Sequence, residues 1–171
     1  VAKPLHGERT FGYPFHVLDG SARLVRSFGT EDRSIDPAFR SAQLRMIAQE
    51  SDTSFWAGRY TNYSLELWSI PRQLLKTVNM SRDWFPPLTK DPGALDGERP
   101  ATTMLSLHRD AHGHLVVLLR RARADWKPRA DSSRRERPPM TPTQMMAYIE
   151  EVIEVVDTTS GRLLSSIVVR D

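Results

Sequence analysis

Four side chains that could bind a metal ion lie close together in this sequence: His108, Asp110, His112 and His114. Imidazole nitrogens and carboxylate oxygens are common zinc ligands, and carboxylates also suit calcium. If a hairpin forms here, His112 lies at its turn and His114 begins its second strand, so both could approach His108. The spacing matches no established zinc motif, and a polar turn with surface histidines is the other interpretation. We therefore expect no bound cofactor, with a divalent metal such as calcium or zinc as the alternative.

A second group combines aromatic and basic side chains: Trp56, Arg59, Tyr60, Tyr63 and Trp68. In proteins that bind single-stranded nucleic acid, aromatic rings stack on bases while arginine contacts phosphate. The alternative is packing between sheets, with Arg59 paired to a carboxylate such as Glu66. Both interpretations stay open. His16, beside the first strand, could line a central funnel, and Trp126 could anchor a partner. The candidate ligand-binding residues are His16, Trp56, Arg59, Tyr60 and Trp126.

The positive charge of the chain is concentrated in one segment. Residues 120–140 carry eight basic and three acidic side chains, a net charge of +5, whereas the whole chain has +3. Contact with nucleic acid or another anionic surface through this arginine-rich insertion is one hypothesis, because each phosphate contact would add salt-dependent affinity. A long, solvated insertion is the interpretation that we favour. Nucleic acid is therefore not the expected partner.

Several kinds of site and segment are absent from the sequence. There is no cysteine, which excludes disulfides, thiolate metal sites and cysteine nucleophiles. We find neither a G-x-S-x-G motif nor a glycine-rich phosphate loop. No run of about 18 apolar residues predicts a membrane span, and no apolar h-region of a signal peptide follows Val1. The first residue is not methionine, so we expect either that a segment before Val1 has been removed or that the chain is part of a longer protein.

The structural elements that would position these residues belong to one repeated sequence unit. An apolar strand, a short polar turn and a second apolar strand recur at residues 15–29, 63–78 and 152–169. Repetition of one supersecondary unit is the signature of a repeat fold. Residues 104–119 predict a further hairpin that turns at 110–113, and its second strand, apolar on both faces, should lie inside a sheet.

Two segments are ambiguous between helix and strand. Asp36 and Pro37 resemble the start of a helix that would run towards Asp52, but residues 44–49 and 54–59 would also serve as a pair of strands. Thr141 to Gln144 matches a capping box, so we expect a short helix near residues 143–151.

The spacing of the repeats predicts a β-propeller. Asp19 and Ser69 occupy equivalent positions 50 residues apart, and the equivalent Asp157 follows 88 residues later because a loop and the basic insertion intervene. Without them the period is about 45–50 residues, which is typical of four-stranded propeller blades. We expect an all-β segment of about two and a half antiparallel blades in one partial domain spanning 1–171. It comprises a half blade at 1–29, a blade at 38–78 and a blade at 102–170 that carries the basic insertion.

Several sequence motifs of this chain resemble those of a known family. The runs Ser54–Tyr60, Tyr63–Trp68 and Trp84–Pro87, the hairpin Asp110–Val117 and the segment Ile153–Leu164 are similar to those of bacterial NHL-like six-bladed β-propeller proteins. Ser69, Pro71 and Val116 depart from the pattern, which usually has Asp, Gly and Trp there. The resemblance implies an extracytoplasmic location, because members of this group are often exported, and it implies no particular activity. It also implies that this chain is the C-terminal portion of such a propeller.

Two functions follow as expectations. The first is a non-catalytic binding or scaffold module whose ligand sits at the funnel mouth; the second is a metal-dependent propeller hydrolase or lactonase. Two and a half blades do not close a ring, so their open sheet edges need cover. The expected partners are the remaining blades of the same longer chain or another protein.

Overall fold

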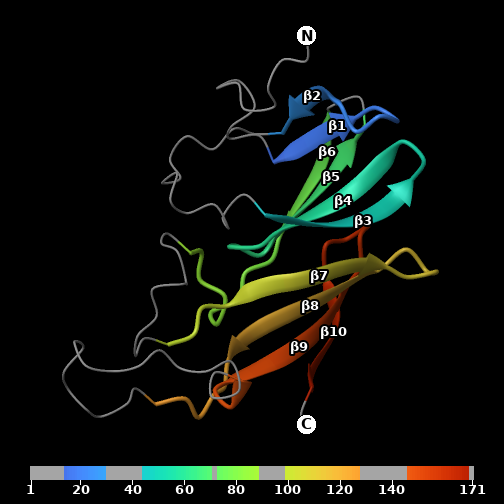
Figure 1. Ribbon diagram of the computed structural model, residues 1–171. Helices are drawn as coiled ribbons and strands as arrows, with labels where there is room; N and C mark the ends of the chain where they lie inside the picture. Colours follow the sequence, from blue (N-terminus) through green and yellow to red (C-terminus); the bar gives the residue numbers. More distant parts are fainter. Residues whose placement is uncertain (1–13, 30–43, 71–72, 89–98, 128–145, 170–171) are drawn as a thin grey trace, which may run out of the picture.

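The computed structural model describes residues 14–29, 44–70, 73–88, 99–127 and 146–169, which form ten strands in three antiparallel sheets (Figure 1). Sheet A contains β1 (Phe15–Leu18) and β2 (Leu24–Phe28). Sheet B has the order β3 (Arg45–Ser51), β4 (Ser54–Arg59), β5 (Ser64–Ser69) and β6 (Leu74–Asn79). Sheet C follows the same plan with β7 (Thr103–Arg109), β8 (Leu115–Ala122), β9 (Ile149–Val156) and β10 (Leu163–Val169). The predicted all-β, propeller-like segment is confirmed.

Two expectations about helices need correction. Residues 45–51 form strand β3, so the helical alternative for 36–52 is wrong there, and residues 36–43 lie outside the described residues. Ile149 to Glu151 begin strand β9, so the helix expected near 143–151 is wrong over these positions, while 143–145 lie outside the description. In both cases pairing with the neighbouring strand, β4 or β8, outweighs local helix signals.

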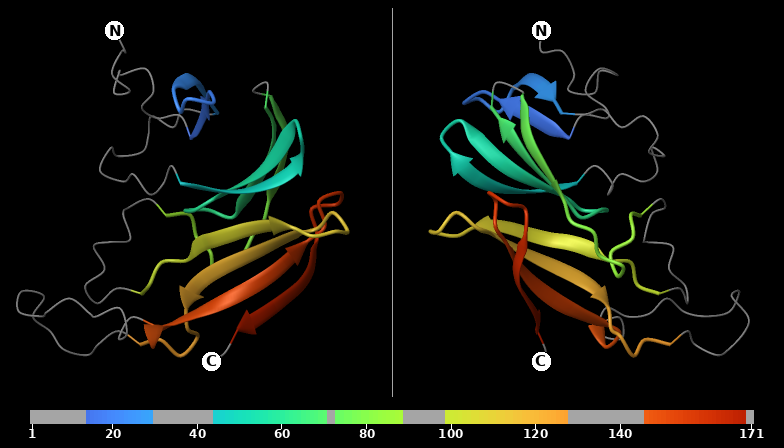
Figure 2. Two further views of the ribbon diagram at one scale, coloured as in Figure 1. Left: turned by 45° about the vertical axis from the view of Figure 1, so that its right-hand side comes forward. Right: turned by 180° about the vertical axis from the view of Figure 1, so that it is seen from behind.

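The three sheets stack in chain order, and Figure 2 shows them fanned from the N-terminal to the C-terminal end. The first strands of sheets B and C, β3 and β7, lie beside each other. Arg109 on β7 forms an ion pair with Glu50 on β3 at 2.7 Å, and the same Glu50 oxygen accepts a hydrogen bond from the Trp56 indole at 2.7 Å. The edge strands β3 and β7 are thus joined by both packing and charge.

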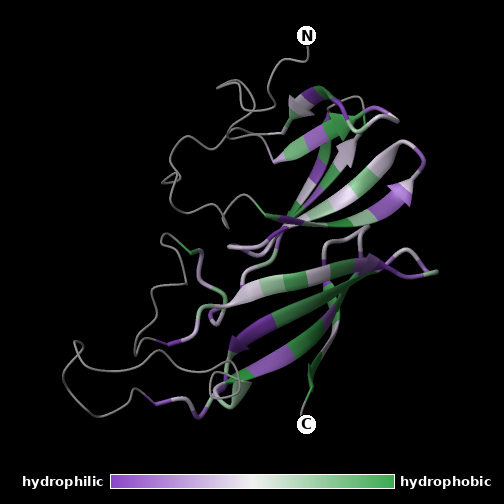
Figure 3. Ribbon diagram, viewed as in Figure 1, coloured by the Kyte–Doolittle hydropathy of each residue, from purple (hydrophilic) through white to green (hydrophobic). Residues whose placement is uncertain are grey.

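Each gap between sheets is filled by apolar side chains. Sheets B and C enclose the larger core, which includes Trp56, Leu65, Leu115 and Val117. Figure 3 shows the hydrophobic residues along β8, which lies between β7 and β9 as expected for an inner strand. Each large side chain buried in this way stabilises the fold by about 1.5–3 kcal/mol. The sheets are therefore held together mainly by apolar contacts between their faces.

A smaller aromatic cluster joins sheet A to sheet B. Phe15 and Phe28 of sheet A pack on Phe55, Ala57 and Trp68 of sheet B, with ring centroids 5.1 to 6.3 Å apart. Most of these rings meet edge to face, which is the favoured geometry for aromatic pairs. Two short strands are thereby fixed on a four-stranded sheet.

The repeated hairpins share one irregularity. In all three, the second strand of the hairpin skips a residue at the same place: Val25 in β2, Leu75 in β6 and Leu164 in β10. The skipped side chains are 60, 49 and 54% exposed. A β-bulge increases local twist, and its recurrence shows that the sequence repeat is also a geometric repeat.

A cation after the bulge ties each sheet to the next. Arg26 of sheet A donates from Nη2 to the carbonyl oxygen of Ile70 at 2.8 Å. Lys76, its equivalent in sheet B, donates from Nζ to the carbonyl oxygens of Thr158 and Thr159 at 2.7 and 2.8 Å. Ile70 and Thr158 occupy equivalent positions in the turns between the last two strands of sheets B and C. We call this contact the cation lock.

Close packing supports the lock between sheets B and C. Gly161 ends the β9–β10 turn with φ of 71°, and a Cβ there would lie 3.1 Å from Val78 of β6. The absence of a side chain allows both the left-handed backbone and the approach of the turn to sheet B.

We expect Lys76→Met to destabilise the protein by about 1–3 kcal/mol, because two carbonyl groups lose a charged donor while the apolar stem is kept. Chemical denaturation followed by tryptophan fluorescence measures this change. Lys127→Met, at an exposed lysine outside the sheets, serves as control and should change stability by about 0.5 kcal/mol or less. Equal effects of the two substitutions would contradict the lock.

Candidate functional site

A hollow that contains one of the candidate binding residues lies along β5, β6 and the segment after β6. It reaches the end of sheet B formed by residues 60–63 and 80–88, which we call the loop edge. The hollow has a volume of about 730 Å³, and we call it the loop-edge groove. Strand residues and the segment after β6 line it: Arg59, Asn62, Tyr63, Ser64, Glu66, Leu74, Thr77, Asn79, Met80, Ser81, Arg82, Asp83, Phe85, Pro86 and Pro87.

Arg59, a predicted binding residue, lines this groove but is paired within its own sheet. Its Nε and Nη2 donate to Oε1 of Glu66 at 3.0 and 2.7 Å. The other carboxylate oxygen of Glu66 accepts the Trp68 indole N–H at 3.0 Å. This confirms the packing interpretation, in which Arg59 pairs with Glu66. Two neighbouring strands hold the guanidinium in place at the rim of the groove.

A second buried glutamate joins sheets B and C. Glu154 on β9 is 1% exposed and accepts the phenolic O–H of Tyr63 at 2.7 Å. Arg82 donates from Nε to its other oxygen at 3.2 Å, and Ser166 of β10 donates to that oxygen at 3.3 Å. Burial, reinforced by the hydrogen bond to Glu154, raises the pKa of Tyr63 far above its ordinary value, so Tyr63 remains a donor. We call Tyr63, Arg82 and Glu154 the carboxylate clamp.

The segment after Arg82 forms the floor of the groove. Phe85 is 4% exposed and its ring lies 5.6 Å from the ring of Tyr63. Trp84 lies under the guanidinium of Arg121, whose Cζ is 4.6 Å from the ring centroid, a cation–π contact. The backbone of Leu88 then donates to the Thr61 carbonyl at 2.9 Å. Side chains of both sheets thus position the groove, which is a product of their stacking.

The charges that line the groove balance. Arg59 and Arg82 are matched by Glu66 and Asp83, so the formal sum is zero. Both arginine side chains are 22% exposed and already paired with glutamate. A neutral ligand with several hydrogen-bonding groups therefore suits this surface better than a strongly charged one.

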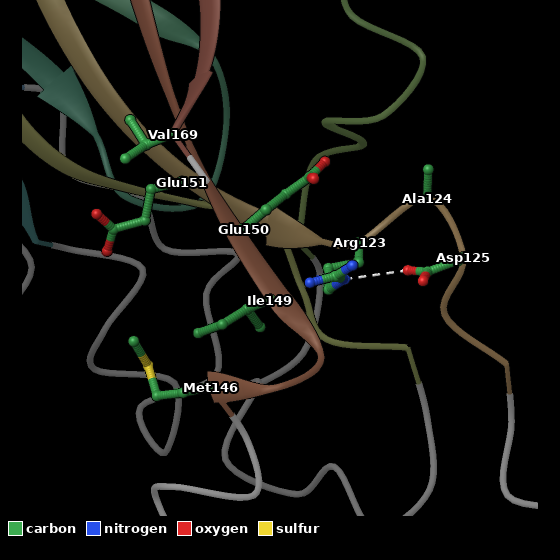
Figure 4. Close-up of a pocket in the computed structure, with 8 residues that line it drawn as sticks. All are labelled: Arg123, Ala124, Asp125, Met146, Ile149, Glu150, Glu151 and Val169. Atoms are coloured by element: carbon green, nitrogen blue, oxygen red, sulfur yellow. Dashed lines mark hydrogen bonds and ion pairs between the residues drawn. The ribbon is translucent and has the colours of Figure 1, made fainter. Parts of the chain in front are cut away.

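A second hollow of about 570 Å³ lies at the start of β9, and Figure 4 shows the side chains that line it. Arg123 and Asp125 form an ion pair at 3.1 Å on one side, while Met146, Ile149 and Val169 supply apolar surface. Glu150 and Glu151 also line it, and they pair with Arg121 and Arg120 at 2.7 and 3.1 Å. This hollow joins the outward face of sheet C.

The candidate metal ligands lie at the other end, around the β7–β8 turn. Asp110 accepts hydrogen bonds from the backbone of His112 and His114, each at 2.8 Å, and from Nδ1 of His114 at 3.0 Å. The rings of His112 and His114 are 6.1 Å apart, and His108 lies on β7 opposite Val116. Within the described parts of the chain, no three His, Asp or Glu side chains form a group that could hold a metal ion. Asp110 is thus the hydrogen-bond acceptor that closes the β7–β8 turn.

The other predicted binding residues are scattered. Trp56 is 2% exposed and belongs to the core, so its role is packing. Tyr60 is half-buried beside the groove, and its carbonyl accepts the Met104 backbone N–H at 3.2 Å. Trp126 is half-buried after β8, and His16 is exposed on sheet A with Nδ1 2.8 Å from Ser27 Oγ. Only Arg59 of the five predicted binding residues lines the groove.

The basic insertion begins inside a strand. Arg120 and Arg121 belong to β8, which corrects the insertion boundary, and residues 128–140 lie outside the description. Arg120, Arg121 and Arg123 each form an ion pair with an acidic side chain. These three arginines therefore offer little excess charge to an anionic partner.

Sequence reasoning missed Arg82 and Glu154, which build the clamp. The sequence does contain an indication of the role of Glu154, because Glu66 and Glu154 occupy the same position of the repeated sequence unit. An acidic residue at a fixed place between apolar neighbours indicates a buried, paired carboxylate. Arg82 has no such signal, since it follows the repeat.

Comparison with models of known protein families, with curated proteins and with solved structures found no match to this chain. Among the described residues, no helix has the length and apolar character needed to cross a membrane.

We expect Glu154→Ala to destabilise the protein by about 3 kcal/mol, because Tyr63 and Arg82 lose their buried acceptor. Glu151→Ala, which removes a half-exposed glutamate from the same strand, should cost about 1 kcal/mol or less. Thermal and urea unfolding of both variants measure the difference. Equal losses would contradict the clamp.

We also expect stability to fall in acid because three turn aspartates have lowered pKa values. Hydrogen bonds from Arg23 lower the pKa of Asp19, and those from Ser160 and Thr159 lower the pKa of Asp157. For Asp110, partial desolvation acts in the opposite direction, but hydrogen bonds from His114 and His112 outweigh it and lower its pKa. A carboxyl group whose pKa is lower in the folded state stabilises the fold at pH values above its unfolded-state pKa of 3.8. This stabilisation is lost as the pH falls through the folded-state pKa.

The free energy of unfolding should therefore decline as the pH is lowered below about 4. The triple variant Asp19→Asn, Asp110→Asn and Asp157→Asn keeps one acceptor oxygen at each turn but does not ionise, so its decline should be shallower. Urea titrations between pH 2.5 and 6 test this expectation (about the range where carboxylates titrate). If the free energy of unfolding falls with pH equally steeply in the wild type and in the variant, the three aspartates do not contribute to the acid sensitivity.

Proposed function

We propose that this chain is a segment of an NHL-like β-propeller that acts as a non-catalytic binding or scaffold module. The stacked four-stranded sheets, the repeated bulge and the repeated cation lock support the proposal. In this proposal the ligand occupies the loop-edge groove, and the sheets serve to position its walls.

One observation carries the binding role: the groove is built from paired polar groups that are already oriented. Arg59 is held by Glu66 and Arg82 by Glu154, so binding requires little ordering of these long side chains. Asn62, Asn79 and Ser81 add neutral donors and acceptors around them. A neutral polar compound, such as a small amide or polyol, is the ligand class that this surface favours.

We expect neutral polar fragments to shift the amide signals of residues 59–66 and 77–87 in protein-observed NMR. Thr77→Trp should abolish these shifts, because the exposed Thr77 lines the groove and the larger ring would fill it. Leu164→Trp places the same ring on an exposed position of β10 and should leave them unchanged. Shifts that cluster elsewhere, or that survive Thr77→Trp, would contradict the groove as the binding site.

A further inference from the structure

In the part of the chain that the structure describes, no further sheet packs on the outward face of sheet C, whereas sheets A and B each have one. Phe28, Val78 and Ile167 occupy the same position in β2, β6 and β10, opposite Phe15, Leu65 and Ile153. Phe28 and Val78 are 6 and 7% exposed because the next sheet covers them, whereas Ile167 is 57% exposed. We call the surface that carries Ile167 the distal face of sheet C.

This distal face is a continuous strip of apolar side chains across three strands. In the sheet register Leu118, Ile153 and Ile167 lie side by side, and Val116 lies beside Val155. The second hollow adjoins this strip at Val169 (Figure 4). The same kind of surface on sheet B is buried against sheet C.

At the opposite end of the stack, no sheet among the described residues covers sheet A. Trp68 and Val156 occupy equivalent positions in β5 and β9 and are 5 and 0% exposed, because each packs towards the preceding sheet. Their equivalent in β1 is Leu18, which is 53% exposed. We call the surface of sheet A that carries Leu18 and His16 the proximal face.

His16 takes the position at which the other sheets have a buried glutamate. Glu66 and Glu154 stand two residues before Trp68 and Val156, as His16 stands two before Leu18. The local geometry agrees, since Ser27 lies 2.8 Å from His16 just as Ser166 donates to Glu154 at 3.3 Å. Sheet A thus presents an imidazole where the other sheets present a carboxylate.

Glu151 is the residue on the distal face of sheet C that would contact the position of His16 on a following sheet. It is the equivalent of Tyr63, the residue through which sheet B contacts Glu154 of sheet C. Glu151 is already neutralised by Arg120 at 3.1 Å. A further carboxylate brought against this pair would bury one net negative charge, whereas a neutral imidazole adds none and can hydrogen-bond.

From this complementarity we propose that the distal face of sheet C binds the proximal face of sheet A of a second copy of this chain, with His16 set against Glu151. The inference rests on the propeller segment of the proposed function, in which each sheet packs on the next. Because the two faces differ, the contact is head-to-tail, and it extends to rings or open chains and not to a symmetric dimer.

The contact lacks the cation lock. Ser165 stands where sheet A has Arg26 and sheet B has Lys76, and its side chain is too short to reach a turn carbonyl of the next sheet. The carbonyl of Gly20 is the equivalent of the Ile70 and Thr158 acceptors. Self-association is therefore weaker than the contacts inside the chain, and Ser165→Lys should restore the missing donor.

Sedimentation velocity over a range of concentrations tests the proposal. The wild-type protein should associate with increasing concentration, and Ser165→Lys should tighten this association about tenfold. Ile167→Asp should abolish it, whereas Leu75→Asp, at an exposed bulge position outside both faces, should not. Circular dichroism checks that each variant is folded. A folded protein that stays monomeric at NMR concentrations, with or without Ser165→Lys, would overturn the proposal.

Mixing two variants tests the head-to-tail geometry. Ile167→Asp keeps an intact proximal face and His16→Glu an intact distal face, so each should be monomeric alone while the mixture forms a one-to-one dimer. Failure of the mixture to pair, or pairing of either variant with itself, would overturn the head-to-tail contact. If the protein is monomeric but neutral polar fragments still shift the amide signals of the groove, the proposed interface is refuted and the proposed ligand site is not. Association without groove binding would instead refute the proposed ligand site.

Discussion

The structure depends on one constraint: its sheets carry apolar side chains on both faces, so each face needs another sheet against it. A β-sheet with one apolar face can leave the other in water, but Trp56 and Phe55 on successive positions of β4 point to opposite sides and are both enclosed. Stacking of sheets is the arrangement that covers both. The fan of three sheets follows from this requirement, and so does the exposure of Leu18 and Ile167 at its two ends.

Apolar contact alone does not specify how stacked sheets align, and polar contacts supply that specificity. The cation lock fixes the outer strand of one sheet to the turn of the next, while the carboxylate clamp fixes their loop edges. Glu154 is nearly inaccessible to water, so its three donors are needed to offset the desolvation of its charge. These contacts also hold Arg82 and Phe85 in the wall of the groove, which links the stability of the stack to the geometry of the candidate binding site.

Much of the architecture could be predicted because its signals are local. Alternation of apolar residues and short polar turns predicted hairpins at 15–29, 63–78, 104–119 and 152–169, close to the observed pairs of strands. Local signals were misleading where a strand begins with residues that also favour helix, as at Ile149, because pairing with β8 decides the outcome there. The site was predicted poorly: Arg59 and its partner Glu66 are close in sequence and were found, whereas Arg82 and Glu154 are separated by 72 positions. No local pattern connects such a pair.

The sequence by itself determined the repeat, its turns and the strands of the repeated hairpins, because each follows from neighbouring residues and the two-residue period of a strand. It also determined which positions are equivalent, and so that His16 replaces a glutamate and Ser165 a cation. Only the tertiary structure decided which faces are covered and which charges meet. The distance between two side chains on different sheets depends on the stacking of whole sheets, and that stacking is a property of no single segment.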